Sequence, residues 1–236
     1  NFYNDHKVLD DVVFPGAGYI DLMLTYTDKI KNISLKDIHF LQPFYLHKYN
    51  DNTMEMVNNN TKMVQFLSNT RGLLCQSVII DNDDKAEKKN TIKYLNSGDN
   101  ERSEENTTVY EDFANNGLLY GNYFQVIQEI HKTDDSLVVM ATIESKNDCR
   151  YNFKIDPSIL DGCFQSALQL YPNKNELLLP SKIELIQFYN DSNKINNRAI
   201  CTCKLIECTS KSMLVNICLF DYDNKELICS IENMLF

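Results

Sequence analysis

Clusters of basic residues are missing from this sequence, and their absence limits the partners that it can bind. The 236 residues include 23 Lys and Arg against 33 Asp and Glu, which gives a formal charge of −10. There is no Arg-rich run and no basic stripe. Phosphate contacts require clustered Lys and Arg, so the composition argues against a nucleic-acid binder and against docking on an anionic membrane.

Long apolar segments are missing as well. The longest apolar stretch, Leu214–Phe220, is interrupted by Asn216 and is far too short to cross a bilayer. The first residues, Asn1–Asp11, are polar and contain no apolar segment of the kind found in signal peptides. We therefore expect no membrane-spanning segment and a cytoplasmic location.

The eight cysteines form no C-x-x-C pair. Cys201 and Cys203 lie two positions apart, so on a strand they would share one face and offer a metal at most two ligands from this motif. We expect no metal site. The cysteines are expected to be buried free thiols, as in a reducing compartment.

A short hairpin is expected near the start of the chain. Strand-like residues end at Leu9 and resume at Val12, with Asp10-Asp11 between them. Asp tolerates the positive φ that a two-residue turn needs. This turn would pair Leu9 with Val12 and would place His6 opposite Pro15.

A helix and several strands should follow the hairpin. The residues from Gly16 to about Ile30 have helical periodicity, with one expected buried stripe of Tyr19, Leu22, Met23, Tyr26 and Ile30. The strand-like runs after it are Ile38–His47, Thr53–Val57, Lys62–Ser68, Leu73–Ile80 and Thr91–Leu95.

The second half repeats this order of elements after a charged segment, Asn96–Thr108, that has no large apolar residue and reads as a linker. A helical stretch, Val109–Leu119, leads into strands. Asp156-Pro157 then has the signature of a helix start, and the helix should end near Pro172, before the strand-rich tail. We predict an α+β chain of two units, residues 1–97 and 109–236, joined by 98–108.

Two polar residues stand out as candidates for chemistry. His6 lies beside Gly16, where a helix N-terminus presents unpaired N–H groups that could bind an oxyanion. Asp161 lies early in the second long helix, with Gln165 four residues on and within hydrogen-bonding reach. Taken singly, a histidine near a turn is more often structural or solvated than catalytic, and an aspartate early in a helix is usually a capping charge.

Three motifs, taken together, resemble the dehydratase domains of polyketide synthases. His6 to Pro15 fits the family's H-x-x-x-G-x-x-x-x-P motif, Tyr120–Phe124 fits Y-G-x-x-F, and Asp161–Gln165 fits D-x-x-x-Q/H. Leu179-Pro180 is similar to the later L-P segment of the family. The motifs occur in the family's order and at plausible spacing.

Two departures from the family accompany this resemblance. Asp10 stands where the first motif has glycine. We interpret this as a cost to folding of about 1 kcal/mol in the turn, with no loss of a catalytic group. The family also has a segment ahead of the motif histidine, of which only five residues are present here. The resemblance therefore implies a piece of a larger synthase.

The resemblance implies a double hotdog fold, in which two curved sheets each wrap around a long helix. It also implies that His6 removes the α-proton of a β-hydroxyacyl thioester and that Asp161 protonates the departing hydroxyl. Gly16 would bind the thioester oxygen, Gln165 would orient Asp161, and Tyr120 would lie near the leaving hydroxyl or support Asp161. Further residues implied to support the site or bind substrate are Pro15, Gly121 and Phe124.

The same resemblance implies the partners. The substrate would arrive on the phosphopantetheine of an acyl carrier protein, no metal or redox cofactor would be needed, and the parent synthase would be a dimer. Two alternatives remain open at this point. One is a double hotdog isomerase or product-template cyclase, which also uses a His–Asp pair, and the other is a non-catalytic domain kept for architecture.

Overall fold

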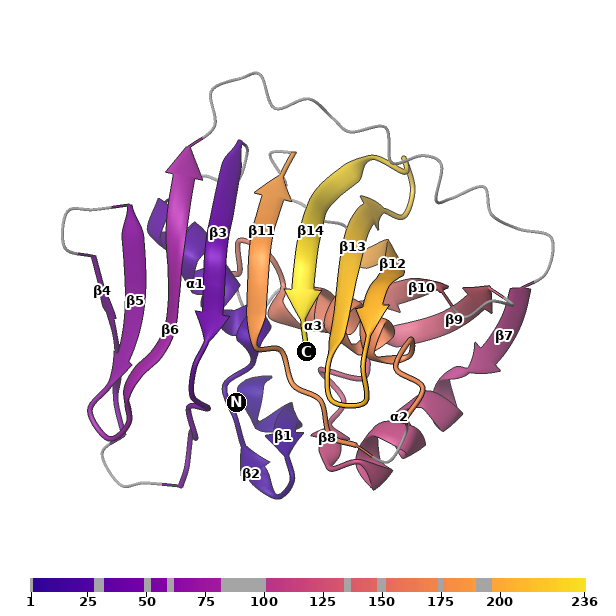
Figure 1. The fold of residues 1–236 in the computed structure, drawn as a ribbon, viewed down its shortest axis with the longest axis horizontal. Coiled ribbons are helices and arrows are strands. Elements are labelled where there is room, and N and C mark those ends of the chain that lie inside the picture. The colour runs from indigo at the N-terminus through magenta and orange to yellow at the C-terminus, as the bar shows by residue number, and fades with distance from the viewer. Residues whose placement is uncertain are drawn as a thin grey trace.

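Antiparallel strands make up most of the chain (Figure 1). The computed structural model describes residues 2–27, 32–48, 52–58, 62–81, 101–133, 137–147, 152–173, 176–189 and 197–236. Within them the large sheet has the order β4-β5-β6-β3-β11-β14-β13-β12-β10-β9-β7. Its strands are β3 Ile33–Phe40, β4 Met54–Val57, β5 Met63–Ser68, β6 Gly72–Asp81, β7 Glu101–Glu105, β9 Ile127–Thr133, β10 Val138–Glu144, β11 Lys182–Phe188, β12 Arg198–Cys208, β13 Met213–Asp221 and β14 Leu227–Leu235.

The two halves of the chain meet in the middle of this sheet. β3 belongs to the first half and β11 to the second, and they pair antiparallel with Ile38 opposite Ile183 and Leu35 opposite Ile186. The four strands β4, β5, β6 and β3 on one side of this junction lie within residues 33–81, and the strands on the other side lie within residues 101–235. The backbone is therefore continuous in hydrogen bonding from one half to the other.

The helices lie behind the large sheet and at its lower end in the view of Figure 1. They are α1 Gly16–Thr27, α2 Asn106–Asn115 and α3 Pro157–Leu168, after a short 3-10 helix η1, Phe2–Asp5. α1 and α3 contact each other, and α3 also contacts β10 and β12. None of the described helices is long and apolar enough to cross a membrane.

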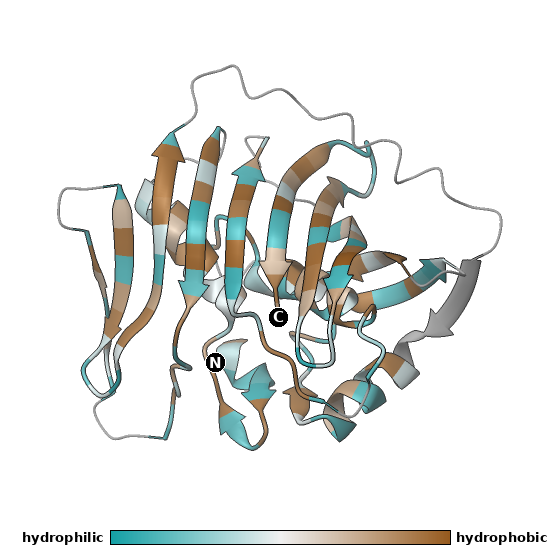
Figure 2. Ribbon diagram, in the orientation of Figure 1, coloured by the Kyte–Doolittle hydropathy of each residue, from teal (hydrophilic) through white to brown (hydrophobic). Residues whose placement is uncertain are grey.

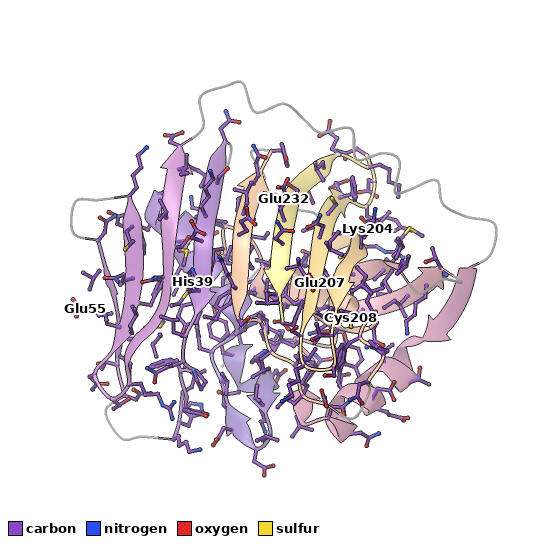
Figure 3. The ribbon with its side chains drawn as sticks, viewed as in Figure 1. His39, Glu55, Lys204, Glu207, Cys208 and Glu232 are labelled. Carbon is purple, nitrogen blue, oxygen red and sulfur yellow. The ribbon has the colours of Figure 1, made fainter. Side chains whose placement is uncertain are left out.

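Alternation along the strands separates the core from the exposed face of the sheet. In β5 and β10 buried residues occupy every second position, and the hydropathy colours of the strands alternate accordingly (Figure 2). This period of two places apolar side chains toward the helices. Polar side chains such as Glu55, Lys204 and Glu207 lie on the strands away from the core (Figure 3).

A second, small sheet holds the start of the chain against the second half. Its order is β2-β1-β8, where β1 is His6–Val8, β2 is Asp11–Val12 and β8 is Leu118–Tyr120. The pairing of β1 with β8 places His6 directly opposite Tyr120. Phe2, just upstream, is buried against the rings of Phe124 and Phe153.

The hairpin register differs from the one that the sequence predicts. Lys7 pairs with Val12, so the turn residues are Leu9 and Asp10, and His6 faces Val13 in place of Pro15. The left-handed φ, 56°, lies at Leu9 and not at Asp10. The backbone N–H of Leu9 also donates to the carbonyl of Gly117 (2.6 Å), a contact across the two halves that helps to hold this register.

The predicted buried stripe of the first helix is wrong in part. Tyr19 and Met23 are buried, but Tyr26 is 50% exposed, and Ile20 and Leu24 are fully buried in its place. Packing of α1 against α3 as well as the sheet turns the buried face away from the predicted stripe. Ile30 lies outside the described residues, and the helix ends at Thr27.

The first long strand is also displaced relative to the prediction. It runs from Ile33 to Phe40 and does not reach His47, whereas the strands predicted at 53–57, 62–68 and 73–80 are present within one residue at either end. The segment after Phe40 contains Pro43 and instead passes beside the hairpin, where Phe44 accepts the N–H of Phe14. The run Thr91–Leu95 lies outside the described residues.

The proposed linker at residues 98–108 is partly regular structure. Glu101–Glu105 forms β7, which pairs with β9, and α2 begins at Asn106. β7 lies at the edge of the sheet, where charged sequences are common because one side of the strand is open to solvent. Apolar periodicity therefore did not reveal it. The division of the chain into units 1–97 and 109–236 stays a prediction.

Candidate active site

His6 begins strand β1, and its imidazole is held in one orientation by the backbone of the hairpin. Its Nδ1 lies 2.8 Å from the carbonyl oxygen of Val13, and the side chain is buried, with 8% of the residue exposed. A carbonyl can only accept, so Nδ1 carries the proton in this contact. In the neutral ring Nε2 then has a free lone pair and can accept a proton.

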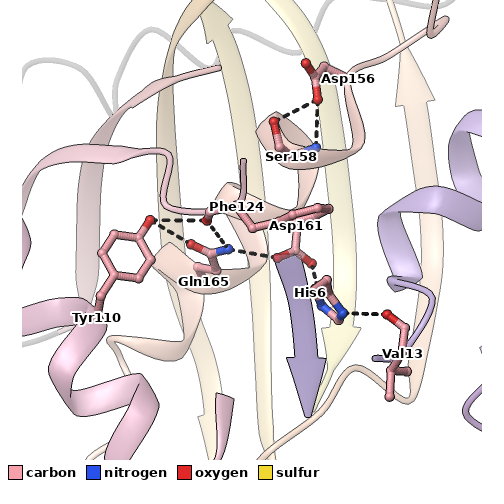
Figure 4. A network of polar contacts seen from close by, with 8 residues as sticks. All are labelled: His6, Val13, Tyr110, Phe124, Asp156, Ser158, Asp161 and Gln165. Atoms are coloured by element: carbon pink, nitrogen blue, oxygen red, sulfur yellow. Dashed lines mark hydrogen bonds and ion pairs between the residues drawn. The ribbon is translucent and has the colours of Figure 1, made fainter. Parts of the chain in front are cut away.

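Asp161 lies in the second turn of α3 and faces His6. Its Oδ1 is 3.8 Å from Nε2 of His6, and the residue is 5% exposed (Figure 4). Burial raises the pKa of the Asp161 carboxyl, while His6 and the hydrogen bond from Gln165 oppose this rise. The net direction is upward, which favours the neutral acid.

The start of α3 is fixed by a cap that the sequence predicts. Asp156 is the N-cap, with its Oδ1 accepting the N–H of Ser158 at 2.8 Å, and Pro157 occupies the first turn. The Oγ of Ser145 donates to the other carboxylate oxygen at 2.6 Å. This cap sets the helix start and with it the position of Asp161, one turn further on.

Gln165 is the residue that holds the Asp161 carboxyl. Its Nε2 donates to Oδ2 of Asp161 at 2.8 Å and to the carbonyl oxygen of Phe124 at 3.0 Å. The side chain is fully buried. Both hydrogens of the amide are thus used, and Oδ1 of Asp161 is left directed toward His6.

Tyr110 completes this chain of hydrogen bonds, and the sequence reasoning did not identify it. Its hydroxyl donates to Oε1 of Gln165 at 3.0 Å and accepts the backbone N–H of Ile127 at 2.9 Å (Figure 4). Its place beside Val109 and Phe113 marks it as part of the buried face of α2. No sequence pattern indicates where its hydroxyl points.

His6 and Asp161 open into one cavity of about 340 Å³ between the two halves of the chain. Its walls are mostly apolar, and residues from both halves contribute. Among them are Val8, Phe14, Phe40, Leu118, Phe164, Leu178 and Phe236. An apolar enclosure of this kind favours the neutral form of the Asp161 carboxyl.

Tyr120 and Gly16 also line the cavity. The ring of Tyr120 lies edge-on to His6, with centroids 5.7 Å apart, and burial raises the pKa of its phenol. The structure gives no hydrogen bond between the hydroxyl of Tyr120 and Asp161. Gly16 is the first residue of α1, so its N–H has no acceptor within the helix.

The remaining residues that the sequence singled out, Phe124, Pro15 and Gly121, are not part of the cavity lining. Phe124 contributes the carbonyl that Gln165 binds, and its ring lies 5.3 Å from that of His6. Pro15 is buried just before α1, and its carbonyl accepts the N–H of Gly18. Gly121 lies against Asp5, where a Cβ would come within 2.5 Å of the carboxyl carbon.

Two models of one known family together match most of this chain. Residues 95–236 match the family model described as polyketide synthase dehydratase N-terminal domain, and residues 1–67 match that of the polyketide synthase dehydratase domain. The chain belongs to the polyketide synthase dehydratase family. Dehydratases of this family are hydro-lyases that act on β-hydroxyacyl intermediates, and the family that the sequence motifs predict is therefore confirmed.

Two curated relatives come from Dictyostelium discoideum. Probable polyketide synthase 1 is 23% identical over 219 residues, which cover 75% of this chain and 7% of that protein. Probable polyketide synthase 42 is 26% identical over 216 residues, which cover 81% of this chain and 8% of that protein. The chain thus spans less than a tenth of each of these relatives.

Solved structures confirm the fold class. The dehydratase domain from the CurF module of curacin polyketide synthase has a TM-score of 0.81 at 19% identity, covering 99% of this chain and 86% of that one. A trans-AT polyketide synthase dehydratase domain from Brevibacillus brevis has a TM-score of 0.80 at 18% identity, covering 99% and 88%. The α+β double hotdog that the motifs imply is the fold of this chain.

Proposed function

We propose that His6 and Asp161 are the base and the acid with which this dehydratase domain removes water from a β-hydroxyacyl thioester. The observation that carries the proposal is their approach, 3.8 Å between Nε2 and Oδ1, inside an apolar cavity. Solved relatives support it. Among them are two inactive mutants, one of the CurJ dehydratase with histidine replaced by phenylalanine and one of the CurK dehydratase with aspartate replaced by asparagine.

The starting state has both groups neutral. His6 donates through Nδ1 to Val13, so the lone pair of Nε2 is available to the substrate. Burial raises the pKa of the Asp161 carboxyl, which favours its protonated form. Since Gln165 donates to Oδ2, the acidic proton belongs on Oδ1, the oxygen nearer to His6.

The elimination then balances within the two residues and the substrate. Nε2 of His6 takes the α-proton, and the electron pair of that C–H bond forms the double bond between Cα and Cβ. The bond from Cβ to oxygen breaks, and the leaving hydroxyl takes the proton of Asp161 to become water. Passage of one proton from His6 to Asp161 restores the starting state. Each of the two proton transfers contributes about 10²–10⁴ in rate.

Gly16 and Tyr120 are the groups assigned to the substrate oxygens. The α-proton is only weakly acidic, so negative charge that develops on the thioester oxygen needs a donor. The N–H of Gly16, at the N-terminus of α1, suits this role. The Tyr120 hydroxyl is assigned to the departing β-hydroxyl, because Tyr120 lines the same cavity beside His6.

The carrier of the substrate follows from the family. A domain of a polyketide synthase receives its intermediates from an acyl carrier protein, and we propose that the phosphopantetheine of that protein brings the thioester into the cavity. We further propose that the parent synthase works as a dimer in the cytoplasm. The chemistry requires only proton transfers between side chains and substrate, so no metal or redox cofactor enters the proposed mechanism.

The test compares matched variants on one substrate series. β-Hydroxyacyl thioesters are offered to the protein, and the enoyl product is followed by mass spectrometry. His6→Ala and Asp161→Asn should each lower product formation by at least ~100-fold. His39→Ala and Asp10→Asn, which lie outside the cavity, should retain full turnover. If Asp161→Asn kept near-full turnover while His6→Ala did not, the acid would be another group, and Tyr120 would be the first candidate.

The same assay separates the two alternatives. A non-catalytic domain would form no enoyl product from any member of the series, even where calorimetry measures binding of the thioesters. An isomerase would shift the double bond of an enoyl thioester without hydrating it. A dehydratase must also catalyse hydration of the enoyl product, because both directions cross the same transition state. His6→Ala and Asp161→Asn must therefore each lower the rates of dehydration and hydration by the same factor.

A further inference from the structure

The hydroxyl of Tyr110 is the most distant member of the hydrogen-bonded chain that ends at Asp161. Its oxygen accepts the N–H of Ile127 at 2.9 Å and donates to Oε1 of Gln165 at 3.0 Å. The carbonyl of Phe124 is farther away, at 3.5 Å, so Gln165 is the better acceptor. Tyr110 lies on α2, outside the cavity lining, and therefore acts through another residue.

We propose that Tyr110 is a positioning residue, which holds the Gln165 amide in the orientation that leaves the acidic proton of Asp161 on Oδ1. The proposal rests on the proposed function of Asp161 as the acid. A phenol has one hydrogen, and with Ile127 as its donor the Tyr110 oxygen gives that hydrogen to Oε1. Oε1 must then face α2, and Nε2 must face Asp161.

The orientation of this amide decides which carboxyl oxygen carries the proton. With Nε2 toward Asp161, Oδ2 accepts a hydrogen bond at 2.8 Å and cannot hold the proton in that contact. In the opposite orientation Oε1 would accept from a protonated Oδ2 and would retain the proton away from His6 and the substrate. Tyr110 and the Phe124 carbonyl both oppose that orientation, one by donating to Oε1 and the other by accepting from Nε2.

Burial keeps the hydroxyl of Tyr110 protonated, and therefore able to donate. Desolvation raises the pKa of the Tyr110 phenol, so it remains protonated and able to donate through the range in which the enzyme can be assayed. The other ionisable groups around Asp161 are His6 on β1, Tyr120 on β8 and Cys163 on α3 itself. Burial raises the pKa of the Tyr120 phenol and of the Cys163 thiol as well, so both remain neutral beside Asp161.

The experiment is a double-mutant cycle of Tyr110→Phe and Gln165→Ala, with kcat, KM and the pH profile measured on a β-hydroxyacyl thioester. Tyr110→Phe keeps the ring and should lower kcat about tenfold, with KM nearly unchanged. The hydrogen bond from Gln165 lowers the pKa of Asp161, so both single variants should move the alkaline limb of the profile to higher pH. In the Gln165→Ala background, Tyr110→Phe should have little further effect on kcat or on the position of the alkaline limb.

A matched control distinguishes positioning from folding. The hydroxyl oxygen of Tyr171, also buried, lies 2.9 Å from Oε2 of Glu176 and 2.7 Å from the carbonyl oxygen of Ser210, outside the cavity lining, and its one hydrogen is shared between these acceptors. Tyr171→Phe should lower the melting temperature and leave kcat and the pH profile unchanged. If Tyr110→Phe behaves like this control, or if its effect on kcat multiplies with that of Gln165→Ala, the proposal is wrong. Retention of turnover by Asp161→Asn would instead refute the proposed function itself.

Discussion

Replacement of Asp21 by asparagine should change how the stability of the protein depends on pH. Asp21 lies on α1, is 4% exposed, and accepts the backbone N–H groups of Lys154 and Ile155 through Oδ1, at 2.7 and 3.1 Å. These two residues lead into the cap of α3. The carboxyl thus connects the helix beside His6 with the helix that carries Asp161.

The magnitude follows from the titration of this carboxyl. Burial raises the pKa of Asp21 from 3.8 to about 6, although the two N–H bonds oppose the rise. Between these pH values the folded chain binds a proton that the unfolded chain does not, so the contribution of Asp21 to stability falls as the pH rises from about 4 to about 6. At about 1.4 kcal/mol per pKa unit, ionisation of Asp21 lowers the free energy of unfolding by about 3 kcal/mol at pH values above about 6.

Asparagine keeps an acceptor oxygen for both N–H groups and carries no charge. The free energy of unfolding of Asp21→Asn should therefore equal that of the wild type near pH 4 and exceed it by up to about 3 kcal/mol at pH 7. Urea unfolding followed by circular dichroism at a series of pH values measures this difference. Asp10→Asn, at an exposed position, is the control for loss of a charge. A difference that stays constant from pH 4 to pH 7, or that favours the wild type at high pH, would refute the reasoning.

Two further predictions concern substitutions to glycine, or of glycine, near the site. Leu9 has a left-handed φ of 56°, so Leu9→Gly should raise the free energy of unfolding by about 1 kcal/mol, whereas Asp10→Gly should bring no gain and leave turnover unchanged. Thermal melts of the two variants check this, and a larger gain for Asp10→Gly would contradict it. Gly121→Ala would place a Cβ 2.5 Å from the carboxyl carbon of Asp5, whose Oδ2 accepts the N–H of Tyr123. Gly121→Ala should destabilise the protein by about 1–3 kcal/mol and lower turnover. Thermal melts and the enoyl assay measure these two effects. A variant with wild-type melting and turnover would show that the close packing of Gly121 against Asp5 is not needed.

The family, the reactive pair and the start of α3 could be predicted from the sequence alone. Each was recognised from motifs whose own residues are close together in the chain, although His6 and Asp161 are far apart from each other. Asp156 caps its helix through an N–H two residues away, and Gln165 reaches Asp161 across one helical turn. The motifs around His6 and Asp161 have fixed internal spacing, so the sequence indicates the residue types at the site. Their catalytic roles stay predictions.

The register of the hairpin, the buried face of α1 and the hydrogen-bond partners of Tyr110 were decided by tertiary structure. The N–H of Leu9 binds the carbonyl of Gly117, and the hydroxyl of Tyr110 reaches Gln165, a residue 55 positions away. Sequence periodicity reports which side chains are apolar but not which distant backbone atom or amide will satisfy a polar group. Those partners are chosen when β1 pairs with β8 and the two halves close around the cavity, and no local pattern contains that information.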